Sequence, residues 1–200
     1  MAYTLITFVS HVCPARLDGA VEWDCHEITM AASRTGPTSS EIVDPPRFII
    51  QQRFKDEATM QQAMAVVPEW AGEGAISVPI QDFPQCEQPE LPREPMLFVP
   101  VKPKDGLDKD EFHARWHSHG PLIQELVPGV RGYVQHHVSP SCEAFNSSGY
   151  DGVARFWFDD IQAVLDLPKT DRFDRIVQDE DSFLSGPLEN YVGHRSRDKE

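Results

Sequence analysis

The chain has 200 residues, of which 40% are hydrophobic and 10% aromatic, and its formal net charge is −14. This apolar content is enough for a real core, so the sequence excludes disorder over most of its length and predicts one compact unit. The charge and the absence of a Lys/Arg stripe exclude nucleic acid and anionic membrane surfaces as partners. No stretch approaches the ~20 apolar residues of a membrane span, and residues 1–11 are typical of a first strand rather than a signal peptide.

Cysteine usage indicates the cellular compartment. Cys13, Cys25, Cys86 and Cys142 are scattered without a CxxC pair. A chain of this size needs no disulfides, so we expect thiols in a reducing cytoplasm. The histidines near Cys13 and Cys25 match no structural zinc spacing, and we expect no metal site.

The first half of the chain contains five predicted elements. Runs of β-branched and aromatic residues predict the strands. Apolar residues at helical spacing that follow a capping aspartate, Asp18 or Asp56, predict the helices. The proline at position 68 is expected to end the second helix, because proline disfavours helical geometry in its predecessor. The elements are a strand at 3–10, a helix at 20–33, a strand at 47–54, a helix from 56 to 67 and a strand at 75–83. Residues 35–40 and 44–46 are typical of loops around a strand that is poor or missing in this half.

The second half repeats this order after a stretch at 84–95 that has four prolines and several acidic residues and is typical of a linker. Asp160 is expected to cap a helix that Pro168 interrupts. The elements are strands at 96–101, 130–138, 152–158 and 189–195, a helix at 107–126, and helical segments that start at 161 and resume at 173–177.

Short motifs also recur between the halves. Trp23-x-x-His26 matches Trp116-x-x-His119, and the triplet 54–56 matches the triplet 158–160. The matches indicate a tandem duplication, although a chance match of short fragments stays open as the alternative.

The order β-α-β-β-α-β in each half is the split-βαβ plan, in which helices cover one face of an antiparallel sheet. Two such sheets can cover each other's open faces and leave a pocket between them. The sequence therefore predicts an α+β protein made of tandem ferredoxin-like halves that form a pseudo-dimeric α/β barrel. Residues 1–83 would be a degenerate N-terminal half, 84–95 the linker and 96–200 the C-terminal half.

The strand at 130–138 alternates between small or apolar residues and polar ones. Tyr133, Gln135 and His137 share one face, and Val134 lies on the other. We expect the polar face to line the barrel pocket. The alternative is an edge strand whose polar face lies in water.

A histidine-rich segment lies on the predicted helix of the second half. His113 and His117 are four residues apart, a spacing that could bind a metal but is more often a solvated face. His119 directly precedes Gly120-Pro121, where helical geometry is disturbed, so its imidazole could point into a pocket. A histidine that titrates near neutrality is the first candidate for acid/base chemistry.

Three ordered motifs between residues 96 and 184 resemble the EthD domain family of the dimeric α/β-barrel superfamily. They are the run from Phe112 to Leu122 with its HGP turn, Pro128-Gly129 followed by the YxQxH strand at 133–137, and the DGxAxxWF strand at 151–158. Members of that family take part in bacterial ether degradation or decarboxylate anthraquinone-type polyketide acids in fungi. The interval from Phe112 to His119 is one residue shorter than usual in the family, and the first half matches only faintly.

The resemblance implies a set of site residues in the second half. His119 corresponds to the HGP histidine, Tyr133, Gln135 and His137 to the YxQxH strand, and Asp151 and Trp157 to the DGxAxxWF strand. For Asp151 a turn-forming role is as plausible as one in orienting a histidine, and for Trp157 packing in the barrel is favoured over stacking on a ligand.

The function that these residues favour is that of a cofactor-independent lyase, most concretely a decarboxylase, acting on an aromatic or polyketide-like acid. The expected catalytic residues are His119, His137, Tyr133 and Asp151, and the expected substrate-binding residues are Gln135, Trp157, Trp116, Phe156 and Phe98.

Several alternatives stay open. The same residues could serve a cyclase, dehydratase or isomerase, or the barrel could bind a small molecule without catalysis. A haem protein is a further alternative, because some barrels of this kind hold haem through a histidine. A homodimer is possible in each case.

Overall fold

The structure is a computed structural model that describes residues 3–10, 16–35, 38–42, 44–71, 75–84, 95–127, 129–138 and 140–196. Its strands are β1 (Tyr3–Val9), β2 (Ala20–Thr35), β3 (Thr38–Glu41), β4 (Phe48–Phe54), β5 (Ile76–Pro84), β6 (Met96–Val101), β7 (Val130–His137), β8 (Gly152–Phe158) and β9 (Leu188–Arg195). Its helices are α1 (Glu57–Ala71), α2 (Lys109–Leu126), α3 (Ile161–Asp166) and α4 (Asp171–Glu180), with 3-10 turns η1 (Glu143–Phe145) and η2 (Leu167–Lys169).

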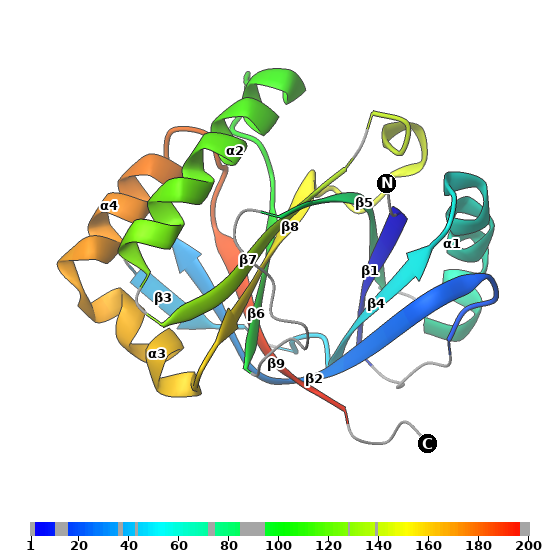
Figure 1. The fold of residues 1–200 in the computed structure, drawn as a ribbon, viewed down its shortest axis with the longest axis horizontal. Coiled ribbons are helices and arrows are strands. Elements are labelled where there is room, and N and C mark those ends of the chain that lie inside the picture. Colours follow the sequence, from blue (N-terminus) through cyan, green and yellow to red (C-terminus); the bar gives the residue numbers. More distant parts are fainter. Residues whose placement is uncertain are drawn as a thin grey trace.

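The strands form one curled antiparallel sheet in the order β3-β2-β4-β1-β5-β7-β8-β6-β9. Strand β2 also pairs with β9, so the sheet closes on itself as a barrel with β3 attached at one rim (Figure 1). Closure gives β2 and β9 hydrogen-bonding partners on both edges, which removes the exposed edges that an open sheet would present. The protein is therefore a mixed α/β fold built around one curled antiparallel sheet.

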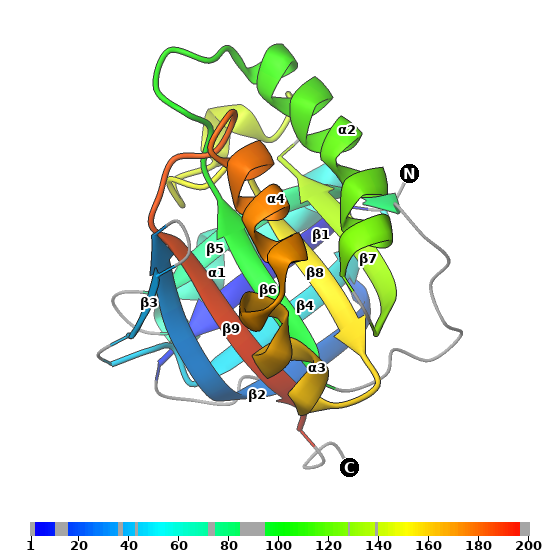
Figure 2. The ribbon, with the colours of Figure 1, turned by 90° about the vertical axis from the view of Figure 1, so that its left-hand side faces the viewer.

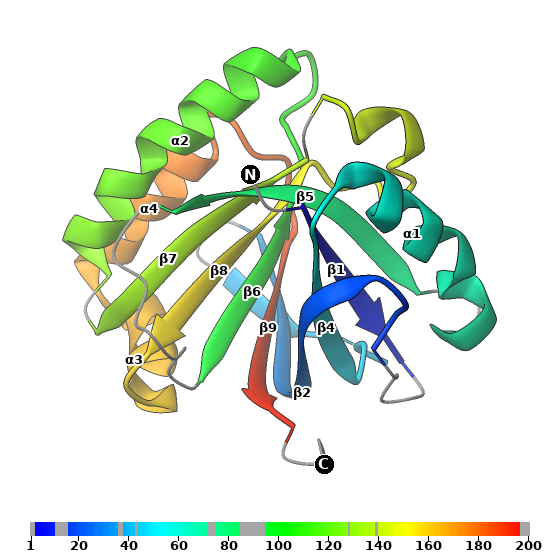
Figure 3. The same ribbon diagram turned by 45° about the vertical axis from the view of Figure 1, so that its right-hand side comes forward.

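The helices lie outside the barrel in two groups. Helices α2, α3 and α4 cover the strands of the second half, and α1 covers β1, β4 and β5 on the other side (Figures 2 and 3). Each strand of the second half thus has a helix face, turned toward α2 and α4, and a barrel face, turned toward the interior.

Two apolar cores correspond to these layers. One fills the barrel and the space under α1 and includes Ile6, Ile49, Phe98 and Trp157. The other lies under α2 and α4 and includes Phe112. Burying such side chains stabilises the fold by roughly 1.5–3 kcal/mol each, so the two cores together fix how the helices sit on the sheet.

The corners from strand to helix follow the predicted capping chemistry. Asp160 accepts a hydrogen bond from the backbone N–H of Ala163 at 2.9 Å, and Asp56 accepts one from Thr59 at 2.8 Å. Asp108 caps α2 in the same way. Each carboxylate satisfies a backbone donor that the first helical turn leaves without a partner. The matching triplets 54–56 and 158–160 occupy corresponding strand-to-helix corners.

The helix predicted at 20–33 is wrong, because these residues form the long strand β2. Strand β2 pairs with β4 over its first part and with β9 over much of its length. These long-range hydrogen bonds outweigh a weak local helical pattern. The Trp23/His26 motif is consequently on a strand and its match, Trp116/His119, on a helix, so the two are not in equivalent places.

Two smaller expectations also need correction. Helix α1 does not end before position 68 but continues to Ala71, and the loop predicted after residue 34 contains β3. A proline inside a helix removes one hydrogen bond, which the packing of α1 on the sheet can offset. Most of the predicted linker, 85–94, lies outside the described residues. In the described part of the chain, none of the helices has the length and apolarity that crossing a membrane requires.

Candidate functional site

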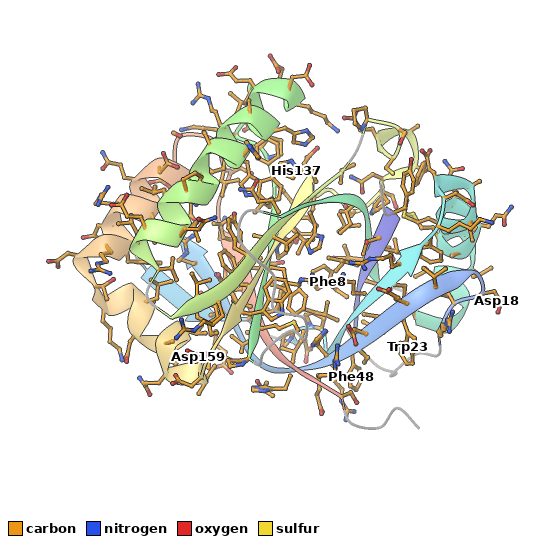
Figure 4. The ribbon with its side chains drawn as sticks, viewed as in Figure 1. Phe8, Asp18, Trp23, Phe48, His137 and Asp159 are labelled. Atoms are coloured by element: carbon orange, nitrogen blue, oxygen red, sulfur yellow. The ribbon has the colours of Figure 1, made fainter. Side chains whose placement is uncertain are left out.

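The polar face of β7 lies under helix α2 and not in the barrel, which corrects the expectation for Tyr133, Gln135 and His137. The Gln135 side-chain amide donates to the backbone carbonyl of Trp116 at 2.5 Å. The His137 ring lies 4.2 Å from the Trp116 ring, and Figure 4 places His137 beside α2. Val134 is on the barrel face instead. Alternation by itself tells which side chains share a face but not which way that face points.

His119 and Asp179 form a hydrogen-bonded pair between α2 and α4. The His119 Nδ1 atom lies 2.6 Å from Asp179 Oδ2. The His119 side chain is only 4% exposed, whereas that of Asp179 is 43% exposed. Because a carboxylate accepts, Nδ1 carries the hydrogen, and Nε2 is the nitrogen that remains for proton exchange. The hydrogen bond therefore fixes both the tautomer and the orientation of the His119 ring.

An apolar cavity of about 60 Å³ lies beside His119, between the helices and the sheet. Trp116, Tyr133 and Phe156 line it together with His119. The rings of Tyr133 and Phe156 stack at 4.5 Å. Four of the predicted site residues thus meet in one place, on the helix face of the sheet.

A chain of hydrogen bonds leads from His137 to the wall of this cavity. The Gln135 amide nitrogen donates to Tyr133 Oη at 3.1 Å, and its Oε1 lies 3.2 Å from His137 Nε2. An amide oxygen only accepts, so Nε2 of His137 carries the hydrogen. These hydrogen bonds therefore orient the Tyr133 hydroxyl group from the side of Gln135 and His137.

Burial keeps His137 neutral. Desolvation, reinforced by the nearby His113, lowers the pKa of His137 to about 2. An imidazole with such a low pKa is no proton donor in its charged form near neutral pH. Since His137 also lies outside the cavity lining, its place favours a positioning role behind Tyr133 over direct acid/base chemistry.

Asp151 lies away from His119, at the start of β8. Its Oδ1 atom pairs with Lys109 Nζ at 3.0 Å, next to Glu143. Its backbone also joins neighbouring segments, because its carbonyl accepts from Val138 and its N–H donates to Val101. These contacts fit the turn-forming role, and they do not bring Asp151 into the cavity.

Phe98 and Trp157 are on the barrel face, away from the cavity. The Trp157 ring packs against the Arg155 guanidinium at 4.5 Å, and Arg155 donates to Gln51. The Phe98 ring lies 5.3 Å from the ring of His26. Figure 4 shows Phe8 on this same interior side. The two residues pack in the barrel core, so the predicted substrate-binding set is divided between two faces of the sheet.

Sequence reasoning missed three polar residues of the site. Asp179 orients His119, and Arg34 and Glu180 form an ion pair in the wall of the cavity. Asp179 and Glu180 follow Ile176 by three and four residues, a helical spacing that could have been noticed in the sequence. Arg34 could not, because its strand was expected to be a helix.

Within the described ranges, no group of three or more His, Cys, Asp or Glu side chains is placed to hold a metal ion. The haem alternative stays open, because a histidine that ligates iron typically donates its other ring N–H to a carboxylate, as His119 does to Asp179.

Comparison with known proteins agrees with this architecture. The family model described as the EthD domain matches residues 104–187, which contain α2, β7, β8 and α4. Among curated protein sequences, none matches the chain.

Solved structures resemble the chain over nearly its whole length. An anthrone oxidase-like protein has a TM-score of 0.61 at 11% identity, over 98% of this chain and 91% of that one. A candidate chlorite dismutase has a TM-score of 0.56 at 13% identity, over 98% of this chain and 95% of that one. A candidate monooxygenase of Lactobacillus acidophilus NCFM has a TM-score of 0.54 at 10% identity, over 97% of this chain and 93% of that one. The chain has the fold of the dimeric α/β barrels. At such identities the likeness is one of fold, and the site has to be argued from its own residues.

Proposed function

We propose that this protein is a cofactor-independent enzyme that decarboxylates a small aromatic or polyketide-like acid, with His119 as its acid/base residue. The observation that carries the proposal is the hydrogen bond of 2.6 Å between His119 Nδ1 and Asp179 Oδ2, made by a histidine that lines an apolar cavity. An oriented histidine in a pocket poor in water is suited to proton transfer to carbon.

The residues have distinct roles in the proposed reaction. The bond between the carboxylate carbon and the ring carbon breaks, carbon dioxide leaves and the electron pair stays on the ring carbon. Protonated His119 delivers its proton from Nε2 to that carbon and is reprotonated from solvent. The Tyr133 hydroxyl donates to the neighbouring carbonyl or phenol oxygen, where negative charge develops, and Trp116 and Phe156 provide the apolar walls. His137 and Gln135 orient Tyr133 without touching the substrate, and Asp151 has only its turn-forming role.

The test is mass spectrometry of the purified protein incubated with a panel of aromatic polyketide acids, beside a His119→Ala control. Loss of the mass of carbon dioxide that depends on His119 is the expected result. Turnover that survives the substitution would remove the acid/base role. Ligand binding without turnover by the wild-type protein would instead favour a non-catalytic carrier.

A second candidate is oxidation of a similar substrate by dioxygen. Structural relatives described as anthrone oxidase-like and as a monooxygenase favour it, at the level of fold. His119 would then remove a proton from an acidic carbon, the carbanion would add dioxygen and take up a proton to give a hydroperoxide, and loss of water would leave a carbonyl group. The same mass measurement separates the two reactions, because this one adds oxygen. A product of unchanged mass with a new retention time would indicate isomerisation or cyclisation.

We further propose that the barrel arose from two tandem ferredoxin-like halves, 1–83 and 96–200. The strand orders β9-β6-β8-β7 and β5-β1-β4-β2 correspond position by position, which supports this origin. The first half would have lost the helix between its first two strands. The closed barrel would then replace the contact that two separate chains make, although association of whole barrels stays open.

A further inference from the structure

A second, larger hollow adjoins the His119 cavity. This hollow, the β2–β9 groove, has a volume of about 300 Å³. Strands β2 and β9 form one of its sides, and η2 with helices α3 and α4 forms the other. This volume is at the lower end of the range for small-molecule sites. The residues that line both the groove and the cavity are Arg34, Leu97, Leu167, Phe173 and Asn190. A ligand could therefore extend from one into the other.

Helix α3, which contacts β8, and the turn η2 form the outer wall of the groove. Neither contains a buried residue. Val164, Leu165 and Leu167 nevertheless turn apolar side chains toward the groove, opposite Met30 and Val192 of the sheet. Leu165 remains 38% exposed. Apolar surface on both sides of an open hollow is typical of a ligand site.

The charge of the groove is opposite to that of the molecule. Among the described residues that line it, Arg34 and Lys169 carry positive charge and none is acidic, in a chain of net charge −14. Their carboxylate partners, Glu180 and Asp166, are outside the lining of the groove. This distribution favours an apolar ligand with a negative group.

Arg34 lies at the junction of groove and cavity. Its side chain is 10% exposed, pairs with Glu180 and has its guanidinium carbon 5.2 Å from the centre of the Phe173 ring. A planar guanidinium that is partly desolvated and stacked on a ring is well suited to binding a carboxylate through two hydrogen bonds. Glu180 is in the position that such a carboxylate would take.

We propose that the β2–β9 groove binds the apolar body of an aromatic carboxylate and that Arg34 binds its carboxylate in exchange for Glu180. The ligand would be the substrate only if the proposed function holds; the binding itself does not depend on it. Strand β2 would then supply the specificity-determining residue to a reaction centre built from the second half of the chain.

The experiment measures binding of 2-naphthoate and of its neutral analogue 2-naphthamide by isothermal titration calorimetry. Arg34→Gln is expected to weaken naphthoate binding by about tenfold or more, since hydrogen bonds between charged groups are lost, and to change naphthamide binding little. Glu180→Gln is expected to strengthen naphthoate binding severalfold, because the internal competitor loses its charge. Arg175→Gln is the control, because Arg175 is also ion-paired, with Glu125, but lies on α4 and does not line the groove.

Leu165→Glu provides an independent test if Arg34→Gln does not fold. A carboxylate in the groove wall should repel naphthoate and weaken its binding severalfold. Val66→Glu is the matched control, because Val66 is 41% exposed on α1, on the other side of the molecule. Equal binding of naphthoate and naphthamide, indifference of naphthoate to Leu165→Glu, or no binding to the wild-type protein would each overturn the proposal.

Two further outcomes distinguish this proposal from the proposed function and from a dimer interface at the groove. Naphthoate binding with the expected variant pattern, but no His119-dependent turnover of any acid, would reject the proposed function alone. A wild-type dimer that Leu165→Glu converts to a monomer, without naphthoate binding, would assign the groove to a second copy of the chain and overturn the ligand proposal.

Discussion

At the scale of single residues, the site depends on how His119 is held. Asp179 fixes Nδ1 as the protonated nitrogen and leaves Nε2 for the proton transfer that we propose. Replacing Asp179 by Asn keeps the shape but allows the amide to present either a donor or an acceptor, so the imidazole loses its defined tautomer.

We therefore predict that Asp179→Asn lowers kcat at least about tenfold and leaves KM nearly unchanged, because orientation matters most in the transition state. The measurement is steady-state kinetics with the substrate that the mass-spectrometric panel identifies. Asp174→Asn, on the exposed side of the same helix, should behave like the wild type. An equal loss in both variants would contradict the positioning role.

The neutral His137 predicts a pH dependence of stability. Its pKa is about 2 in the folded protein and about 6.5 when unfolded, so the unfolded state takes up the proton first as pH falls below 6.5. The stability that His137 contributes is complete above pH 6.5 and is lost as pH falls toward 2. At pH 4 the loss is on the order of 3 kcal/mol.

Urea unfolding at a series of pH values checks this expectation. His137→Phe should flatten the fall in unfolding free energy between pH 6.5 and 4, and His117→Phe, at an exposed position of α2 whose charge contributes least to the low pKa of His137, should flatten it far less. A wild-type unfolding free energy that is constant over this window would show that His137 is protonated without cost.

At the scale of elements, the site requires α2 to approach β8 very closely. Gly152 begins β8, and a Cβ atom there would lie 2.4 Å from Cζ3 of Trp116 and 2.5 Å from the His136 carbonyl oxygen. Both neighbours are buried, and one of them is backbone. Only glycine lets α2 lie this close to the strand.

Gly152→Ala should consequently destabilise the protein by about 1–3 kcal/mol and weaken activity as well, because Trp116 lines the cavity. Thermal unfolding and kinetics measure the two effects. Gly186→Ala, where nothing lies within 4 Å of the added methyl group, is the control. A Gly152→Ala variant as stable as this control would mean that α2 can shift without cost.

At the scale of the whole molecule, the barrel is closed by pairing between the two halves. Strand β9 pairs with β2, and β7 pairs with β5. A fragment of residues 95–200 would leave β7 and β9 as exposed edges and the barrel face uncovered. We expect this fragment to associate with a second copy of itself. Light scattering coupled to gel filtration should give twice the fragment mass, and a stable monomeric fragment would contradict the expectation.

The sequence by itself determined most of the local structure. The strands at 3–10, 96–101 and 152–158 and the helix over 107–126 are confirmed within a few residues, because alternation, helical periodicity and capping aspartates are local signals. The motifs of the second half also indicated residues of the cavity, His119 and Tyr133 among them. Chemistry that depends on neighbours in sequence can be read from sequence.

Only the tertiary structure decided the rest. Residues 20–35 became a strand because distant strands offered hydrogen bonds on both edges, and this brought Arg34 to the cavity. The polar face of β7 turned toward α2 because the barrel face had to join an apolar core, and Asp179 reached His119 across two helices. Pairing partners, face direction and contacts between distant residues are set by the packing of the whole chain, which no short pattern encodes.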